Sequence, residues 1–306
     1  MKIYVAGHRG LVGSAVVRAI EAGRTHTWIG KTRSELDLLN REAVFSYVAK
    51  EKPDWVVIAA AKVGGIRANA SHPVEFLTEN LQIETNLLDA CHAANIQKVL
   101  FLGSSCIYPK MSPQPIKEEY LLTGPLEPTN EAYALAKIAG LKLVEAYKRQ
   151  FGHDWISAMP TNLYGPGDNY DLENSHVLPA LIRKFHEAKK NHKNEVELWG
   201  SGAPLREFLH SDDLAAACLH LLESYSGTTA LNIGSGSEVS IKDLALQVAQ
   251  VVGFQGAINW NSSMPDGTPR KFLDITKLLG TGWAPKISLE DGIRNVYEDC
   301  KTQDWY

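Results

Sequence analysis

Tyr133 and Lys137 are the side chains of this sequence whose types and spacing best suit acid–base chemistry. They lie one helical turn apart within 131–150, a stretch with few helix breakers, so both should project from one face of a helix. A tyrosine is a poor acid–base group at neutral pH, but a neighbouring ammonium favours the phenolate and lowers the pKa of the phenol. Ser104 follows an apolar run and could hold a substrate oxygen beside Tyr133. A tyrosine and a lysine at this spacing often occur by chance on a helix surface. The pair therefore indicates a catalytic site only together with the neighbouring motifs.

A glycine-rich turn precedes these residues in the chain. The segment 7–13 reads GHRGLVG and lies between a strand-like apolar run at 2–6 and an amphipathic helical pattern at 11–20. Glycines let the backbone approach a pyrophosphate closely, and the start of the following helix offers unpaired N–H groups to it. A plain strand-to-helix turn is the alternative, but the placement between strand and helix favours a dinucleotide site.

Cations follow the second predicted strand, near 26–30, where NAD enzymes usually place an acidic residue. Lys31 and Arg33 lie there, and Arg9 lies inside the glycine turn. Positive charge at this place suits the 2′-phosphate of NADP(H), although the two strand-end cations could instead be solvated loop charges. Asp37 and Leu38, slightly further on, could contact the adenine.

Apolar runs alternate with helical patterns through the first half of the chain. The predicted strands are 2–6, 26–30, 55–60, 98–102 and 155–159, and the predicted helices are 11–20, 41–51, 80–95 and 131–150. Since the strands lack alternation of apolar and polar residues, they should form a parallel sheet covered on both faces. The predicted fold class is therefore α/β, with a Rossmann doubly wound parallel sheet.

The character of the sequence changes after about residue 163, where Gly, Pro and Asn cluster and elements become shorter. We expect an NADP-binding domain from 1–163 plus the strand near 230–233. A smaller α/β lobe that binds substrate should comprise 164–229 and 235–306. No clean linker separates the two, so they should interleave.

Composition narrows the class of function. The net charge of −4 and the pI of about 6.2 do not suit a nucleic-acid binder. The four cysteines are scattered without a CxxC pair, which indicates reduced thiols in a cytoplasmic protein, with no metal and no disulfide framework. We find no signal peptide and no apolar stretch long enough to cross a membrane.

The chain resembles the extended short-chain dehydrogenase/reductases over essentially its whole length, and within them the GDP-L-fucose synthase family. The segments that carry the resemblance are 6–10, 59–66, 102–110, 127–131, 160–166, 174–177 and 265–271. The resemblance implies conversion of GDP-4-keto-6-deoxy-D-mannose to GDP-L-fucose with NADPH. Carbons 3 and 5 are inverted first, and the ketone at carbon 4 is then reduced.

The resemblance also implies roles for individual residues. Ser104, Tyr133 and Lys137 match the reductive triad, and Cys106 and His176 match the acid/base pair of the epimerisation. Inverting a carbon beside a ketone needs groups that take up and deliver protons near neutral pH, and a thiol and an imidazole can do so. Taken alone, a single cysteine is more often a small buried apolar residue.

Two further sets follow from the resemblance. The cofactor-binding residues are Gly7, His8, Arg9, Gly10, Leu11, Val12, Gly13, Arg33, Asp37, Leu38, Leu102, Gly103, Ser104, Ser105, Lys137, Pro160, Thr161, Asn162, Leu163 and His176. The residues that hold the GDP-sugar are Lys184, Trp199, Arg206 and Asp266. Relatives can carry arginine at position 184, and lysine lacks its bidentate fork. Otherwise, Trp199 would be an ordinary core tryptophan, and Arg206 would form a surface ion pair with Glu207.

Two other functions compete with this interpretation. A nucleotide-sugar 4-epimerase or dehydratase would retain NAD, which the cations at the second strand disfavour. A non-catalytic NADP(H)-sensing regulator would not need both Tyr133 and Lys137. We also expect a homodimer, because the helices at 80–95 and 131–150 could pair across subunits as a four-helix bundle.

Overall fold

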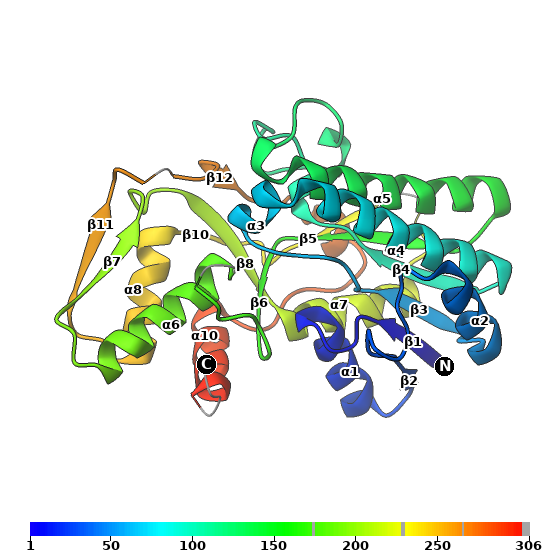
Figure 1. The fold of residues 1–306 in the computed structure, drawn as a ribbon, viewed down its shortest axis with the longest axis horizontal. Helices are drawn as coiled ribbons and strands as arrows, with labels where there is room; N and C mark the ends of the chain where they lie inside the picture. Colours follow the sequence, from blue (N-terminus) through cyan, green and yellow to red (C-terminus); the bar gives the residue numbers. More distant parts are fainter. Residues whose placement is uncertain (173–174, 228–229, 265, 302–306) are drawn as a thin grey trace.

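The computed structural model describes residues 1–306 except 173–174, 228–229, 265 and 302–306. Asn174 and Pro265, which belong to segments of the resemblance, lie outside the described residues. Figure 1 shows a helix-covered sheet on one side and a smaller group of strands and helices on the other.

The larger part is built on a six-stranded sheet in which every pairing is parallel. Its strands, in spatial order, are β2 (Thr27–Ile29), β1 (Lys2–Ala6), β3 (Trp55–Ile58), β4 (Lys98–Leu102), β5 (Ile156–Pro160) and β9 (Leu231–Ile233). The central strands are buried on both faces, which is why they read as continuous apolar runs. The predicted fold class, a Rossmann α/β sheet, is confirmed, including the return of 231–233 to the sheet.

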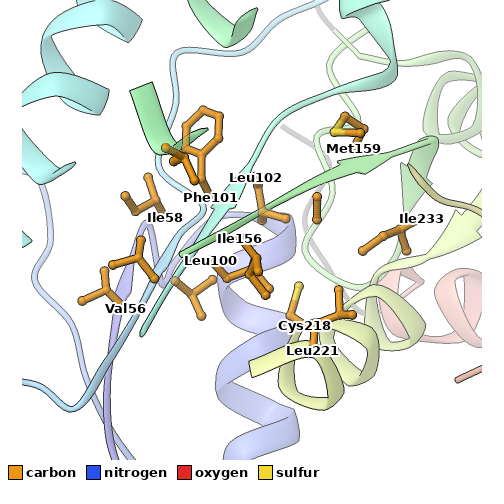
Figure 2. Packing of buried hydrophobic residues seen from close by; sticks show 14 of the residues in the cluster. Val56, Ile58, Leu100, Phe101, Leu102, Ile156, Met159, Cys218, Leu221 and Ile233 are labelled. Carbon is orange, nitrogen blue, oxygen red and sulfur yellow. The ribbon is translucent and has the colours of Figure 1, made fainter. Parts of the chain in front are cut away.

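Helices cover both faces of this sheet. On one face, α1 (Leu11–Gly23) packs against α7 (Ser211–Ser224); on the other lie α2 (Arg41–Glu51), α4 (Pro73–Ala93) and α5 (Glu131–Phe151). Successive residues of β4 point to opposite faces, so Leu100 lies on the side of Cys218 and Leu221 of α7, while Phe101 points toward α5 (Figure 2). The sequence division placed 211–224 in the lobe, but α7 contributes to the core of the large sheet.

The helix predicted at 80–95 begins earlier, at Pro73. Proline is favoured in the first turn of a helix because its missing N–H would be unpaired there anyway. Helix α5 matches its prediction closely and ends at Phe151, where the C-cap residue Gly152 has a φ of 73°. No helix among the described residues is long and apolar enough to cross a membrane.

The smaller part has its own apolar core. It contains a four-stranded sheet of β10 (Glu238–Ser240), β8 (Leu205–His210), β12 (Arg270–Lys271) and β6 (Asn162–Tyr164), and a pair of β11 (Ala257–Asn261) and β7 (Glu195–Trp199). Helices α6 (Val177–Lys190), α8 (Ile241–Val252) and α10 (Leu289–Cys300) pack on these strands. The remaining elements are α3 (Ile66–Ser71), α9 (Thr276–Leu279), η1 (Ser105–Ile107), η2 (Glu118–Tyr120) and η3 (Pro128–Asn130).

Strand β8 links the two parts through Glu207, which is fully buried. Its carboxylate accepts hydrogen bonds from the backbone N–H groups of Gly236, across 2.9 Å, and Leu273, across 3.2 Å. Its carbonyl oxygen accepts a bond from the Asn162 side chain across 2.8 Å. Because a buried carboxylate must be satisfied, its bonds hold β8 against the segments that follow β9 and β12, and the carbonyl bond holds it against β6.

Candidate active site

A cavity of about 530 Å³ opens along the carboxyl ends of β1, β3, β4 and β5. This is the size of a ligand pocket, and it lies where open α/β sheets bind their ligands. Seventeen predicted cofactor residues lie in its wall: Gly7, Gly10, Leu11, Val12, Arg33, Asp37, Leu38, Leu102, Gly103, Ser104, Ser105, Lys137, Pro160, Thr161, Asn162, Leu163 and His176.

The glycine turn brings the backbone close to this cavity. Gly7 has a φ of 88°, and a Cβ added to it would lie 2.7 Å from the backbone nitrogen of Ala60. Gly13 contributes to packing, since an added Cβ would lie 2.1 Å from the carbonyl oxygen of Gly7. Gly13 therefore lets α1 approach the turn, and the cavity wall does not include it.

A smaller hollow adjoins the cavity beside the glycine turn. Its wall contains His8, Arg9, Lys31 and Arg33, together with Gly7, Gly10, Thr32 and Ser34. The ammonium of Lys31 lies 3.3 Å from the carboxylate of Glu35, which offsets part of its charge. The structure thus gathers the three predicted cations at one hollow, an arrangement that suits a phosphate.

Ser104, Tyr133 and Lys137 also lie in the cavity wall. The hydroxyl of Ser104 hydrogen-bonds with Tyr133 and accepts a bond from the backbone N–H of Cys106 across 3.2 Å. The ammonium of Lys137 lies 3.0 Å from the carboxylate of Glu84, which is buried on α4. The three residues predicted to form the triad are therefore brought together.

The electrostatics of Tyr133 differ from the sequence prediction. Burial raises its pKa, and the charges of Cys106 and Glu84 raise it further, while the hydrogen bond with Ser104 acts in the opposite direction. The pKa is thus raised and not lowered as the sequence predicted, and the ammonium of Lys137 is paired with Glu84. Tyr133 is thus held as a protonated phenol, a state that can donate a proton.

Cys106, His176 and Lys271 line the same cavity. The ammonium of Lys271, on β12, donates to Cys106 Sγ across 3.3 Å. Burial alone would raise the pKa of the Cys106 thiol, but the charge of Lys271 and hydrogen bonds with Ser104 and Lys271 outweigh burial and lower it. Burial lowers the pKa of His176, and Lys271 lowers it further. A neutral imidazole and an acidified thiol are suited to moving protons near neutral pH.

Lys184, Trp199, Arg206 and Asp266 form a second cluster, on the smaller lobe. The ammonium of Lys184 lies 5.7 Å from the ring centre of Trp199, and Asp266 accepts bonds from the backbone and hydroxyl of Ser201 across 2.9 and 2.7 Å. The charge of Asp266 acts on the guanidinium of Arg206, whose pKa burial lowers. The cavity wall formed by the described residues includes none of the four predicted residues.

Two alternatives raised by the sequence can be settled. Trp199 is 57% exposed, so it is not a core tryptophan. Arg206 does not form a surface ion pair with Glu207, because Glu207 is buried and its carboxylate accepts backbone N–H groups.

Comparisons with known proteins agree with this geometry. A family model described as the NAD dependent epimerase/dehydratase family matches residues 3–234. The chain is 58% identical over 305 residues to a protein of Arabidopsis thaliana named putative GDP-L-fucose synthase 2, with 100% of this chain and 91% of that protein covered. It is 50% identical over 306 residues to GDP-L-fucose synthase of Escherichia coli (strain K12), with 97% and 95% covered. A solved structure of a GDP-L-fucose synthetase from Naegleria fowleri bound to NADP is 28% identical, with a TM-score of 0.90 and 98% and 94% of the chains covered.

The chain belongs to the GDP-L-fucose synthase family. This membership confirms the family that the sequence segments predicted. Two residues of the site were nevertheless missed at the level of sequence. Lys271 lies in one of the resemblance segments, so its cationic type next to Arg270 was an available signal. Glu84 gave no signal, because a glutamate on a helix is usually solvated.

Proposed function

We propose that this chain is a bifunctional epimerase/reductase that converts GDP-4-keto-6-deoxy-D-mannose to GDP-L-fucose with NADPH. The observation that carries the proposal is the meeting of two sets of proton-transfer groups in one cavity. Tyr133 and Ser104 form one set, and Cys106, His176 and Lys271 form the other. The glycine turn opens on the same cavity, so both chemical steps can share one bound substrate.

The residues present fit NADP(H). Gly7 has a left-handed backbone and packs against the backbone of Ala60 in the cavity wall, where no side chain would fit, and Arg9, Lys31 and Arg33 line a hollow that suits a 2′-phosphate. When bound, NADPH supplies the hydride for carbon 4 of the sugar. The cations disfavour a 4-epimerase or dehydratase that retains NAD, and the retained pair Tyr133 and Lys137 disfavours a non-catalytic regulator.

In the epimerisation, Cys106 and His176 are the acid/base pair. The substrate ketone acidifies the protons on carbons 3 and 5, and Ser104 and Tyr133 hold the ketone oxygen as negative charge develops on it. The thiol, acidified by Lys271, and the neutral imidazole then remove a proton from one face and deliver one to the other.

In the reduction, Tyr133 delivers the proton to the oxygen on carbon 4. Burial keeps its phenol protonated, and the hydrogen bond with Ser104 fixes the orientation of the group. Lys137 holds the nicotinamide ribose from the next turn of α5, and its position one turn from Tyr133 keeps both groups on one face.

The smaller lobe holds the GDP-sugar in this proposal. The exposed ring of Trp199 can stack on the guanine, and Lys184 and Arg206 can bind the diphosphate. Asp266, which fixes the backbone of Ser201, holds the loop beside Trp199. The NADP-binding domain is then 1–163 with the strand near 230–233 and with α7, which packs in the core of the large sheet. The rest of 164–229 and 235–306 builds the lobe.

We also propose a cytoplasmic homodimer. Helices α4 and α5 pack side by side and carry large apolar side chains that are exposed, including Val74, Leu135 and Phe151. Pairing these helices with those of a second subunit would cover that surface.

The test mixes the purified chain with NADPH and GDP-4-keto-6-deoxy-D-mannose, follows NADPH absorbance and identifies the sugar by NMR. NADPH consumption with GDP-L-fucose as product is the expected result. Formation of GDP-rhamnose would retain the reductase and overturn the roles of Cys106 and His176. Absence of NADPH consumption would overturn the proposal as a whole.

A further inference from the structure

Glu84 and Lys137 form a buried ion pair. The reaction described above gives Lys137 a role but gives none to Glu84. Glu84 on α4 is 1% exposed, and its Oε1 lies 3.0 Å from Nζ of Lys137 on α5. Removing two charges from water is costly, and their attraction repays that cost only when the geometry is good. A glutamate in this place is thus a poor choice for packing alone.

Gly140 on α5 and Phe101 on β4 pack closely around this ion pair. A Cβ added to Gly140 would lie 2.5 Å from Oε2 of Glu84 and 2.5 Å from Cζ of Phe101. The ammonium of Lys137 also lies 4.7 Å from the ring centre of Phe101, a distance that allows a cation–π contact. Glycine at position 140 therefore admits the carboxylate of Glu84 between α5 and β4.

The charge of Glu84 reaches the acid–base group of the reduction. It raises the pKa of Tyr133 after burial and Cys106, and it offsets the ammonium of Lys137. Burial raises the pKa of Glu84 itself, and Lys137 opposes that increase. The other titratable or charged groups at this cavity are Cys106 on η1, His176, Lys271 on β12, Lys62 with Glu79, which pair across 2.6 Å, and, near the glycine turn, Lys31, Arg33 and Asp37.

We propose that Glu84 is a positioning residue for the reduction, which holds the ammonium of Lys137 at the cavity wall and offsets its charge so that Tyr133 stays protonated as the donor. This inference rests on the proposed function. Without the carboxylate, the unbalanced ammonium favours the phenolate, and the donor loses its proton at a lower pH. Lys137 would also lose the contact that restrains its long side chain.

The experiment measures kcat for NADPH oxidation as a function of pH in the full-length wild type and in Glu84→Gln. We expect kcat at pH 7 to fall about tenfold, and the alkaline limb of the profile to move to lower pH by about one unit. Asp89→Asn is the matched control, because Asp89 lies on the same helix but pairs with Arg41. Its alkaline limb should match that of the wild type.

Glu84→Asp is the conservative variant and keeps the negative charge. Its alkaline limb should lie close to the pH of the wild-type limb, even if its kcat stays low. A loss of packing alone would lower kcat in both Glu84 variants and leave both alkaline limbs at the wild-type pH. An alkaline limb of Glu84→Gln that coincides with that of Asp89→Asn would overturn the inference. Should Glu84→Gln fail to fold, an alkaline limb of Glu84→Asp shifted as far as one unit would overturn it as well. If the wild type itself consumes no NADPH with this substrate, the proposed function fails instead.

Discussion

Replacing Lys271 by methionine tests the electrostatic account of epimerisation most directly. The change removes the ammonium that lies 3.3 Å from Cys106 Sγ and keeps a side chain of similar length. Two unit charges at that distance attract by at most about 5 kcal/mol at an effective dielectric constant near 20. A hydrogen bond to a charged group is worth about 1.5–3 kcal/mol net, which corresponds to roughly one to two pKa units.

The thiol of Cys106 should then titrate about one to two units higher in Lys271→Met, since burial raises its pKa and only Ser104 still opposes it. The rate of proton exchange at carbons 3 and 5 should fall about 10- to 100-fold at pH 7 and recover as the pH is raised. The rate recovers at higher pH because Lys271 lowers the pKa of the thiol. Without Lys271, a higher pH is needed to deprotonate the thiol.

The assay follows wash-in of deuterium from heavy water into GDP-4-keto-6-deoxy-D-mannose by NMR, with NADPH omitted so that reduction cannot occur. Lys271→Arg, which keeps the charge, should retain most of the exchange. Lys242→Met is the control, because Lys242 is an exposed lysine at the start of α8. Exchange by Lys271→Met at the wild-type rate and with the wild-type pH profile would refute the reasoning.

Three further substitutions test other parts of the site. Tyr133→Phe removes the proton donor, so NADPH oxidation should fall about 10²- to 10⁴-fold while titration calorimetry still detects substrate binding; near-normal turnover would contradict the triad. Cys106→Ser should slow deuterium wash-in at carbons 3 and 5 at least tenfold with little change in the Kd for NADPH; unchanged wash-in would exclude Cys106 as a proton carrier. Arg33→Ala removes a cation from the phosphate hollow, so the preference for NADPH over NADH in kcat/KM should fall about tenfold or more; an unchanged ratio would place the 2′-phosphate elsewhere.

The sequence predicted the features that depend on local order. Each of three features depends on residues that are close together in the sequence: the glycine turn, the apolar strands of the large sheet, and the spacing of Tyr133 and Lys137. The structure places all three as expected. The start of α4 at Pro73 was missed because the apolar pattern becomes clear only later in that helix. Strand β7 alternates exposed and buried residues, but it is only five residues long and pairs with a single strand, so its signal was weak.

The contacts that set charge in the site could not be predicted, because they join distant segments. Lys271 and Cys106 are 165 residues apart in the chain and meet only when β12 lies against the rest of the fold. Glu84 and Lys137 meet through the packing of α4 on α5. Pattern and propensity describe neighbours in sequence, so the pKa of a side chain in such a contact follows from tertiary structure alone.

The contact between Lys271 and Cys106 also predicts that Cys106 reacts with oxidants before the other three cysteines. Peroxides attack thiolates, and the pKa of Cys106 is lowered, whereas burial raises the pKa of Cys91, of Cys218 to about 12 and of Cys300 to about 11. Conversion of Cys106 to a sulfenic acid would remove one proton carrier and leave Tyr133 intact. Under the proposed function, oxidative stress would therefore change which sugar the enzyme releases, with the uninverted product gaining over the inverted one.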